Sequence, residues 1–203
     1  MSEKPRDSRT AILKAAVVEF AKHGLSGTRM EHVAVRSGFN KALVYRYFGS
    51  REELFSNALA FKFDQQMSVA VAAPADLGDA LVYWFENASR DPRFVQLLQR
   101  EALEHEGDEL VHEDFRRDYY AVQLADLQAR QDRGQLDPVL PLKPLLLLLS
   151  ALVSFPAFFP NLTRLICGAD ANTLPNDWKR LLREIASRLG PRQQEDAPPP
   201  TKA

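Results

Sequence analysis

The side chains best suited to binding another molecule lie between residues 28 and 55. This span holds the cations Lys41, Arg46 and Arg51 together with the phenols Tyr45 and Tyr47. Cationic and phenolic side chains bind phosphate oxygens, and the unpaired backbone amides at a helix N-terminus favour an anion in the same way. The combination is typical of a surface that binds the nucleic-acid backbone.

A short helix is predicted at the start of this span. Thr28 with Glu31 three residues later forms a capping box, in which the threonine hydroxyl accepts from a helical amide, so the helix should begin near Arg29. Gly38 supplies the left-handed conformation that ends it. The residues at helical spacing that should face inward are Met30, Val33, Ala34 and Ser37.

A second short helix and a longer third one follow. Asn40 is a suitable N-cap for a helix over residues 41–47. Ser50 with Glu53 forms a second capping box, which opens a helix that extends to about Ala72. The side chains of the middle helix that are left to project are Lys41, Ala42, Tyr45 and Arg46.

This order of helices is a helix-turn-helix, and it resembles the DNA-binding domain of the TetR/AcrR family of bacterial one-component repressors. The matching segments are Gly38-Phe39-Asn40, Val44-Tyr45-Arg46-Tyr47-Phe48 and Ser50-Arg51-Glu52-Glu53-Leu54. The resemblance implies a double-stranded DNA operator as partner; the alternative is a helical hairpin that only packs. The predicted DNA-binding residues are Thr28, Arg29, Asn40, Lys41, Ala42, Leu43, Tyr45, Arg46, Tyr47, Ser50 and Arg51.

Phe39, Asn40 and Leu43 depart from the residues usual in that family. Leu43 stands where the family often has a threonine or serine that contacts DNA. A leucine facing DNA can contact a thymine methyl but cannot form a hydrogen bond. Base recognition is therefore expected to depend more on Lys41 and Arg29.

The charge of the chain is unevenly distributed. Of 203 residues, 45% are hydrophobic and 26% charged, which describes a soluble globular chain of one or two domains. The net charge is −1, but residues 1–55 carry +4 and residues 56–203 carry −5. The basic end is the end with the helix-turn-helix, which favours nucleic-acid contact there.

Cys167 is the single cysteine, so neither an intrachain disulfide nor a zinc cluster of thiolates is available. The first ten residues are charged and contain no apolar segment, so they are not a secretory signal. These features predict a cytoplasmic protein without a cofactor.

No alternating strand pattern occurs, so an all-α fold is predicted. Three N-terminal helices should form a DNA-binding domain over residues 8–55, joined by a long helix to a larger ligand-binding and dimerisation domain over residues 56–190. Residues 191–203 have the composition of a disordered tail.

Glycine and proline mark the expected helix ends. The first helix should run from Asp7 or Ser8 to His23 and stop at Gly24. Later helices are expected to end at Arg90, about Glu106 and Gly134, and the last should run from about Asn176 to just before Gly190.

The most apolar tract runs from Leu145 to Pro160 without a charge. Its sixteen residues are fewer than the roughly twenty needed to cross a bilayer, and Pro156 interrupts them. A helix apolar on all sides is otherwise buried by its own domain and by a partner subunit. The family resemblance implies a homodimer formed by the helices that begin near Leu145 and Asn176, whereas a membrane-associated protein is the alternative.

Several aromatic and flexible side chains lie on helices that surround a small-molecule pocket in the resembled architecture. They are Phe63, Met67, Trp84, Phe115, Tyr119, Phe155 and Phe158. Residues at helical spacing also form ordinary cores, so the alternative is that they only pack. A pocket lined by them would favour a hydrophobic or aromatic effector.

Asp118 is the polar member of the stripe expected to face inward on the long helix. The other members are Val111, Phe115, Val122, Ala125 and Ala129. A buried aspartate needs a partner. Two hypotheses follow: Asp118 pairs with an arginine such as Arg93, Arg100 or Arg164, or it lines the pocket and binds the effector.

A cluster of acidic residues and histidines is the competing sign of chemistry. It contains His105, Glu106, Asp108, Glu109, His112 and Glu113. Its spacing lacks the HExxH pattern of a zinc enzyme, and charged clusters at helix junctions are usually solvated, so no metal is predicted. Nucleophile-elbow, P-loop and Rossmann glycine patterns are also missing, so a helical enzyme is the weaker hypothesis.

The sequence thus predicts a homodimeric transcriptional regulator, expected to be a repressor. It should bind a palindromic operator and be released by a small effector. A regulator that answers only to a protein partner is a further alternative, and it would lack a cavity of ligand size.

Overall fold

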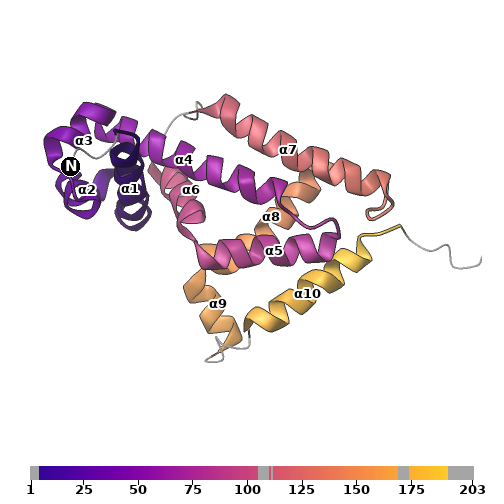
Figure 1. Cartoon of the computed structure of the whole chain (residues 1–203). Coiled ribbons are helices and arrows are strands. Elements are labelled where there is room, and N and C mark those ends of the chain that lie inside the picture. Colours follow the sequence, from indigo (N-terminus) through magenta and orange to yellow (C-terminus); the bar gives the residue numbers. More distant parts are fainter. Residues whose placement is uncertain (1–4, 105–109, 111, 169–173, 192–203) are drawn as a thin grey trace, which may run out of the picture.

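The computed structural model of the chain describes residues 5–104, 110, 112–168 and 174–191. These residues form ten α-helices, and no strand occurs among them (Figure 1). The predicted all-α fold is confirmed. Of the predicted tail, residues 192–203 lie outside the described part of the chain.

Three helices form the lobe at one end of the molecule: α1 (Pro5–Gly27), α2 (Met30–Ser37) and α3 (Lys41–Phe48). The first helix begins earlier than predicted and continues beyond Gly24, where the backbone (φ 70°, ψ −178°) departs from helical geometry. The predicted stop at Gly24 is therefore a kink. The apolar residues that repeat at helical spacing on α1 are buried: Ile12, Ala15, Ala16 and Phe20.

The long helix α4 (Arg51–Val71) joins this lobe to the rest of the molecule, with the bounds that the sequence predicts. The hydrophobic core of the lobe continues along α4 to Phe63. Leu97 and Tyr119, from two later helices, belong to the same core. The lobe and the body therefore share one apolar cluster.

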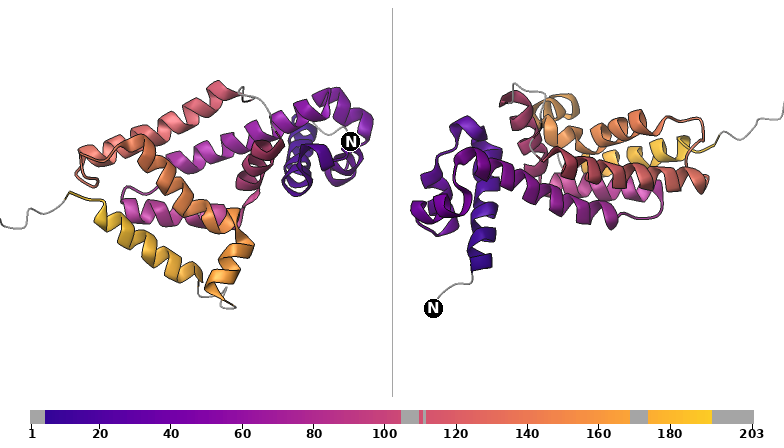
Figure 2. Two further views of the ribbon diagram at one scale, coloured as in Figure 1. Left: turned by 180° about the vertical axis from the view of Figure 1, so that it is seen from behind. Right: turned by 90° about the horizontal axis from the view of Figure 1, so that it is seen from above.

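The body consists of six further helices: α5 (Leu77–Arg90), α6 (Arg93–Glu104), α7 (Glu113–Asp132), α8 (Leu142–Phe158), α9 (Pro160–Cys167) and α10 (Leu174–Arg188). Helix α5 packs against both α8 and α10, and α4 packs against α7. Seen from above, the lobe projects from one end of this body (Figure 2). A second core joins α5, α7, α8 and α10 through residues such as Leu81, Phe85, Leu127, Leu149 and Leu182.

The inward face of α7 differs from the predicted stripe. Phe115, Asp118 and Val122 are exposed, whereas Arg116 and Tyr119 are buried. Two more buried positions, Leu127 and Arg130, lie on the same face of the helix. The prediction was wrong because it treated both arginines as solvated, although each has partners that neutralise it.

The apolar tract is split into two helices. Pro156 lies inside α8, and Pro160 is the first residue of α9. Within the described residues, no single helix is long and apolar enough to span a membrane. Helices α8 and α9 reach that length and hydropathy only when taken together, and the chain bends by 85° between them.

Candidate functional site

The turn between α2 and α3 has the predicted chemistry. Gly38 ends α2 in the left-handed conformation (φ 80°), and Asn40 caps α3 by accepting from the Leu43 amide at 2.8 Å. Val44 and Phe48 face inward and are buried. The opposite side of α3 is thereby fixed toward solvent.

The exposed side of α3 presents Lys41, Ala42, Tyr45 and Arg46, as predicted. The ammonium of Lys41 contacts the Glu31 carboxylate on α2 and lies 5.6 Å from the centre of the Tyr45 ring. The hydrogen bond from Lys41 to Glu31 raises the pKa of Lys41 and lowers the pKa of Glu31. Both groups are therefore charged at neutral pH.

Tyr47 and Leu43 are less exposed than predicted for side chains that bind DNA. Both are half-buried, and Tyr47 packs against the core of the lobe. The Tyr47 ring lies 5.9 Å from the Arg46 guanidinium. Its ring therefore contributes to the fold of the lobe as well as to the surface.

Thr28 does not cap α2. The N-cap residue is Arg29, which makes no side-chain cap bond, and the Thr28 hydroxyl donates to the Gly24 carbonyl at 2.7 Å. The prediction failed because the kink at Gly24 leaves a carbonyl unpaired, and the buried hydroxyl of Thr28 satisfies it. The Arg29 side chain remains exposed beside it.

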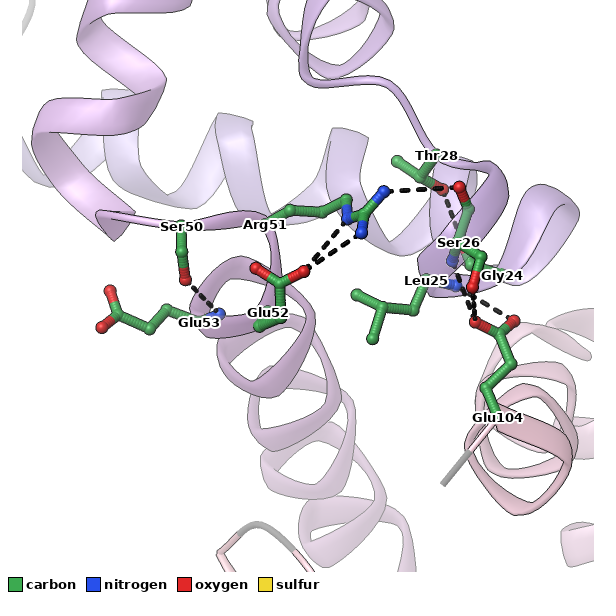
Figure 3. Close-up of polar contacts among 9 residues, drawn as sticks. All are labelled: Gly24, Leu25, Ser26, Thr28, Ser50, Arg51, Glu52, Glu53 and Glu104. Carbon is green, nitrogen blue, oxygen red and sulfur yellow. Dashed lines mark hydrogen bonds and ion pairs between the residues drawn. The ribbon is translucent and has the colours of Figure 1, made fainter. Parts of the chain in front are cut away.

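The start of α4 follows half of the predicted capping box. The Ser50 hydroxyl accepts from the Glu53 amide at 3.0 Å, whereas the Ser50 amide donates to the Phe48 carbonyl. Arg51 pairs with Glu52 at 3.1 Å and donates to the Ser26 carbonyl at 3.3 Å (Figure 3). Arg51 is thus tied to the turn that precedes α2.

A shallow surface depression of about 440 Å³ joins the starts of α2 and α4. It brings together five of the predicted DNA-binding residues: Thr28, Arg29, Tyr45, Ser50 and Arg51. Two carboxylates, Glu31 and Glu52, also border it. Anionic phosphate can approach the depression because each carboxylate already pairs with a neighbouring cation.

A second hollow lies in the body, where α4, α6 and α7 meet. It has a volume of about 490 Å³, within the range of small-molecule sites. We call it the cleft; its walls are Phe63, Leu98, Glu101, Ala102, Leu110, Glu113, Arg116, Arg117 and Tyr120. Burial raises the pKa of Tyr120, so its phenol stays protonated and can donate.

A buried ion pair forms the polar floor of the cleft. Both terminal nitrogens of Arg116 donate to the Glu101 carboxylate, at 2.7 and 2.6 Å. The Arg116 guanidinium also lies 5.3 Å from the centre of the Phe63 ring. The pair is neutral as a unit, which suits a ligand that is largely apolar. This pair was not predicted, because a charged residue on a helix is normally placed toward solvent.

The predicted ligand-binding residues do not gather at one place. Phe63 lines the cleft, and Tyr119 packs behind it with ring centres 5.4 Å apart. Met67 packs against the first core and Trp84 against the second. Phe155 and Phe158 both lie against Phe159, at the end of α8.

Asp118 satisfies neither hypothesis. It is exposed, no ion pair involves it in the part of the chain that is described, and it is absent from the cleft walls. Arg93 pairs instead with Asp91, and Arg100 donates to the Lys22 carbonyl. The predicted pairing was wrong because Asp118 lies on the outer face of α7.

Most of the acidic and histidine cluster lies outside the described residues. Within them, His112 contacts the Ser56 hydroxyl at 2.8 Å and Glu113 pairs with Arg117 at 2.5 Å. No group of metal-ligating side chains occurs among the residues that the structure covers.

Comparison with known proteins identifies the family. The model of the N-terminal region of bacterial regulatory proteins of the tetR family matches residues 12–58. The model of the tetracyclin repressor-like C-terminal domain matches residues 76–188, more than half of the chain. The chain belongs to the tetR family. It is therefore a DNA-binding transcriptional regulator, and its family is not one of enzymes.

Individual relatives match this chain over most of its length. The transcriptional repressor SCO4008 of Streptomyces coelicolor is 33% identical over 191 residues, covering 91% of this chain and 97% of that protein. The crystal structure of SCO4942 from the same organism superposes with a TM-score of 0.76 at 24% identity, over 92% of this chain and 99% of that one. FadR of Bacillus subtilis, solved with stearoyl-CoA, has a TM-score of 0.63 at 18% identity, over 86% and 97% of the two chains.

Proposed function

We propose that this tetR-family chain is a homodimeric repressor of a palindromic operator, released when a small hydrophobic or aromatic effector occupies the cleft. The exposed face of α3 carries the DNA-binding part of the proposal. Lys41, Tyr45 and Arg46 project from it, and Arg29 stands beside it at the start of α2. The Streptomyces coelicolor relative is named as a repressor, which supports repression rather than activation by this chain.

The shape and lining of the cleft support the effector. Phe63, Leu98 and Tyr120 supply apolar and aromatic walls, and the paired charges of Glu101 and Arg116 leave little net charge. A similar fold in FadR accommodates stearoyl-CoA, whose acyl chain is apolar. These features suit an uncharged or weakly polar compound with an aromatic or aliphatic body.

Exposed apolar side chains on α8, α9 and α10, and at the junction of α8 and α9, support the dimer. They are Leu147, Leu148, Phe159, Leu162, Leu165, Ile166 and Leu181. Large apolar side chains gathered on an exposed surface favour an interface. We assign α8 and α10, the helices that contain Leu145 and Asn176, to contact with a second copy of the chain.

The DNA-binding face is tested by removing single cations. Arg29→Ala and Arg46→Ala should each weaken binding to duplex DNA and reduce the slope of log affinity against log salt by about one unit, because each lost phosphate contact releases fewer counterions. Arg133→Ala is the matched control, since Arg133 is exposed at the C-terminal end of α7, away from the proposed DNA-binding face and dimer interface. Fluorescence anisotropy across a salt series measures the slope. Equal slopes for all three variants would remove α2 and α3 from the interface.

The effector site is tested with compounds that release the wild-type protein from DNA. Tyr120→Ala should raise the concentration needed for release at least fivefold, because Tyr120 lines the cleft. Phe115→Ala is the control: it also truncates an aromatic ring of α7, with 37% exposure against 40% for Tyr120, but outside the cleft. Loss of response in the Phe115 variant alone would place the effector elsewhere.

A further inference from the structure

One carboxylate of the body accepts three hydrogen bonds from the lobe. Glu104, the last residue of α6, accepts from the Leu25 amide at 3.1 Å and from the Ser26 amide at 2.9 Å. The Ser26 hydroxyl donates to the same carboxylate at 3.1 Å. Figure 3 shows this carboxylate reaching from the end of α6 to the last turn of α1, which follows the kink at Gly24 and which we call the turn. Ser26 and Glu104 are 78 positions apart in the sequence.

The turn is shaped to receive this carboxylate. Gly24 has a positive φ of 70°, which L side chains rarely adopt. A Cβ at this position would also overlap Oε1 of Glu104. The backbone conformation thus favours glycine here, and a side chain at this position would displace the Glu104 carboxylate. One turn earlier on α6, Arg100 donates to the Lys22 carbonyl at 3.0 Å and adds a second link to the end of α1.

The same turn leads directly to the DNA-binding surface. The Ser26 carbonyl accepts from Arg51, the first residue of α4, and Thr28 is anchored to the Gly24 carbonyl. Arg29 follows as the N-cap of α2. A shift of the turn would therefore displace Arg29 and Arg51, two cations that border the depression at the starts of α2 and α4.

The residues of α6 that precede Glu104 belong to the cleft. Leu98, Glu101 and Ala102 line it, and Glu101 is held by Arg116 of α7. Glu101 and Glu104 are three residues apart, so they project from neighbouring turns of one face of the helix. The wall of the cleft and the carboxylate that binds the turn therefore belong to the same short stretch of α6.

We propose that Glu104 is the positioning residue through which occupancy of the cleft changes operator affinity. The proposal rests on the function proposed above. An occupant that separates α6 from α7 moves the end of α6 and withdraws the Glu104 carboxylate from the amides of Leu25 and Ser26. The turn then loses its charge-assisted bonds, and Arg29 and Arg51 lose their fixed positions.

A double-mutant cycle tests the proposal without a known effector. Ala102→Trp places an aromatic side chain in the cleft as a tethered occupant, since Ala102 is an exposed residue of its wall. Glu104→Gln keeps the shape of the side chain but offers one acceptor for two amides. The cycle measures affinity for duplexes selected from random DNA by the wild-type protein, with Asp64→Asn, an exposed charge change on α4, as the control background.

The proposal predicts that Ala102→Trp weakens binding at least fivefold in the wild-type and Asp64→Asn backgrounds, but less than twofold in the Glu104→Gln background. Such coupling lies within the range of allosteric effects. An equal loss in all three backgrounds, or no loss in any, would overturn the role of Glu104 and leave the proposed function standing. Failure to select any duplex would overturn the proposed function, and the inference with it.

Hydrogen exchange provides a second measurement that does not depend on DNA. The amides of Leu25 and Ser26 should exchange at least tenfold faster in Glu104→Gln than in the wild type, while the amides inside α3 are unchanged. Ala102→Trp alone should accelerate the same two amides. Unchanged protection of both amides in both variants would contradict the proposed link, and a melting curve excludes general unfolding as the cause.

Discussion

Glu31 controls how available Lys41 is for DNA. The two side chains are paired on the surface predicted to meet the operator, and both are exposed. Lys41 can contact a phosphate or a base only after leaving this carboxylate. Glu31 therefore competes with DNA for Lys41, because the carboxylate occupies the cation that a phosphate would bind.

Removing this competitor should strengthen binding. Glu31→Gln is expected to raise affinity for duplexes of any sequence and to steepen the salt dependence by about one unit of slope, because one more cation becomes free for phosphate. A salt series measured by anisotropy checks this, with Asp64→Asn, an exposed charge change on α4, as the control. An unchanged or shallower slope would show that Lys41 does not contact DNA.

A second cluster of charges ties α4 to the start of α6. Lys62 is buried and donates to Asp91 and to Gln65, both at 2.9 Å, and Asp91 also accepts from Arg93 at 2.5 Å. Burial alone would raise the pKa of Asp91, but the hydrogen bonds from Arg93 and Lys62 outweigh it and lower the pKa to about 2. Asp91 is thus the counter-ion that makes a buried lysine tolerable.

Because of this cluster, the free energy of unfolding should fall as the pH is lowered into the acid range. The contribution of Asp91 is fully present above its ordinary pKa of 3.8 and is lost as the pH falls toward 2. Asp91→Asn should lower the free energy of unfolding at neutral pH by about 1 to 3 kcal/mol and remove this part of the decline. Urea unfolding at pH 6 and pH 3 measures both. Restoration of stability by Lys62→Met in the same protein would identify the stranded cation as the cause.

At the scale of helices, the sequence predicts strongly capped elements well. Asn40 and Ser50 cap α3 and α4 as expected, because their local bonds need no distant partner. The rotation of α7 was not predictable in this way. Arg116 and Arg130 face inward because Glu101, Asp126 and the carbonyls of the α4–α5 loop neutralise them, and a single sequence does not show which helices will supply such partners.

The two candidate sites differ in the same way in how much of each the sequence predicts. The DNA-binding face depends on helical spacing within one segment, so the projection of Lys41, Tyr45 and Arg46 was predicted. The cleft depends on how three distant helices meet, so of the aromatic residues proposed for it Phe63 lines it while Phe115 does not. Spacing along α7 cannot decide between its two faces when both carry aromatic residues.

Helix α8 has one face in its own core and another that we propose contacts a second copy of the chain. Leu149 is 3% exposed and belongs to the same core as Leu182, which is 1% exposed, whereas the adjacent Leu148 is 64% exposed. A charge at Leu149 or Leu182 would therefore test folding rather than assembly. The positions that test the interface are Leu148 and Leu181.

Two substitutions on one helix should separate assembly from folding. Leu148→Glu is expected to give a folded monomer with weakened operator binding, because it places a charge in the proposed interface. Leu149→Ala should instead lower stability by about 2 to 5 kcal/mol while the protein stays dimeric. Sedimentation and thermal melting distinguish them. A dimeric, normally binding Leu148→Glu protein would refute the assignment of α8 to the interface.

At the scale of the whole molecule, the lobe shares its hydrophobic core with the body. Its core includes Phe63 of α4, Leu97 of α6 and Tyr119 of α7, so the body completes the packing of the DNA-binding helices. A three-helix lobe of this size is marginal alone. The shared core explains how an event in the body can reach α2 and α3, and it predicts that both parts unfold together.

We propose that a two-fold dimer presents two copies of α3 to one face of duplex DNA. Selection of bound sequences from random duplexes tests this arrangement. We expect an enriched inverted repeat, with half-sites separated by about one helical turn, roughly 34 Å, because two symmetric recognition helices enter successive major grooves. Recovery of no preferred sequence, or of a single motif without a repeat, would contradict it.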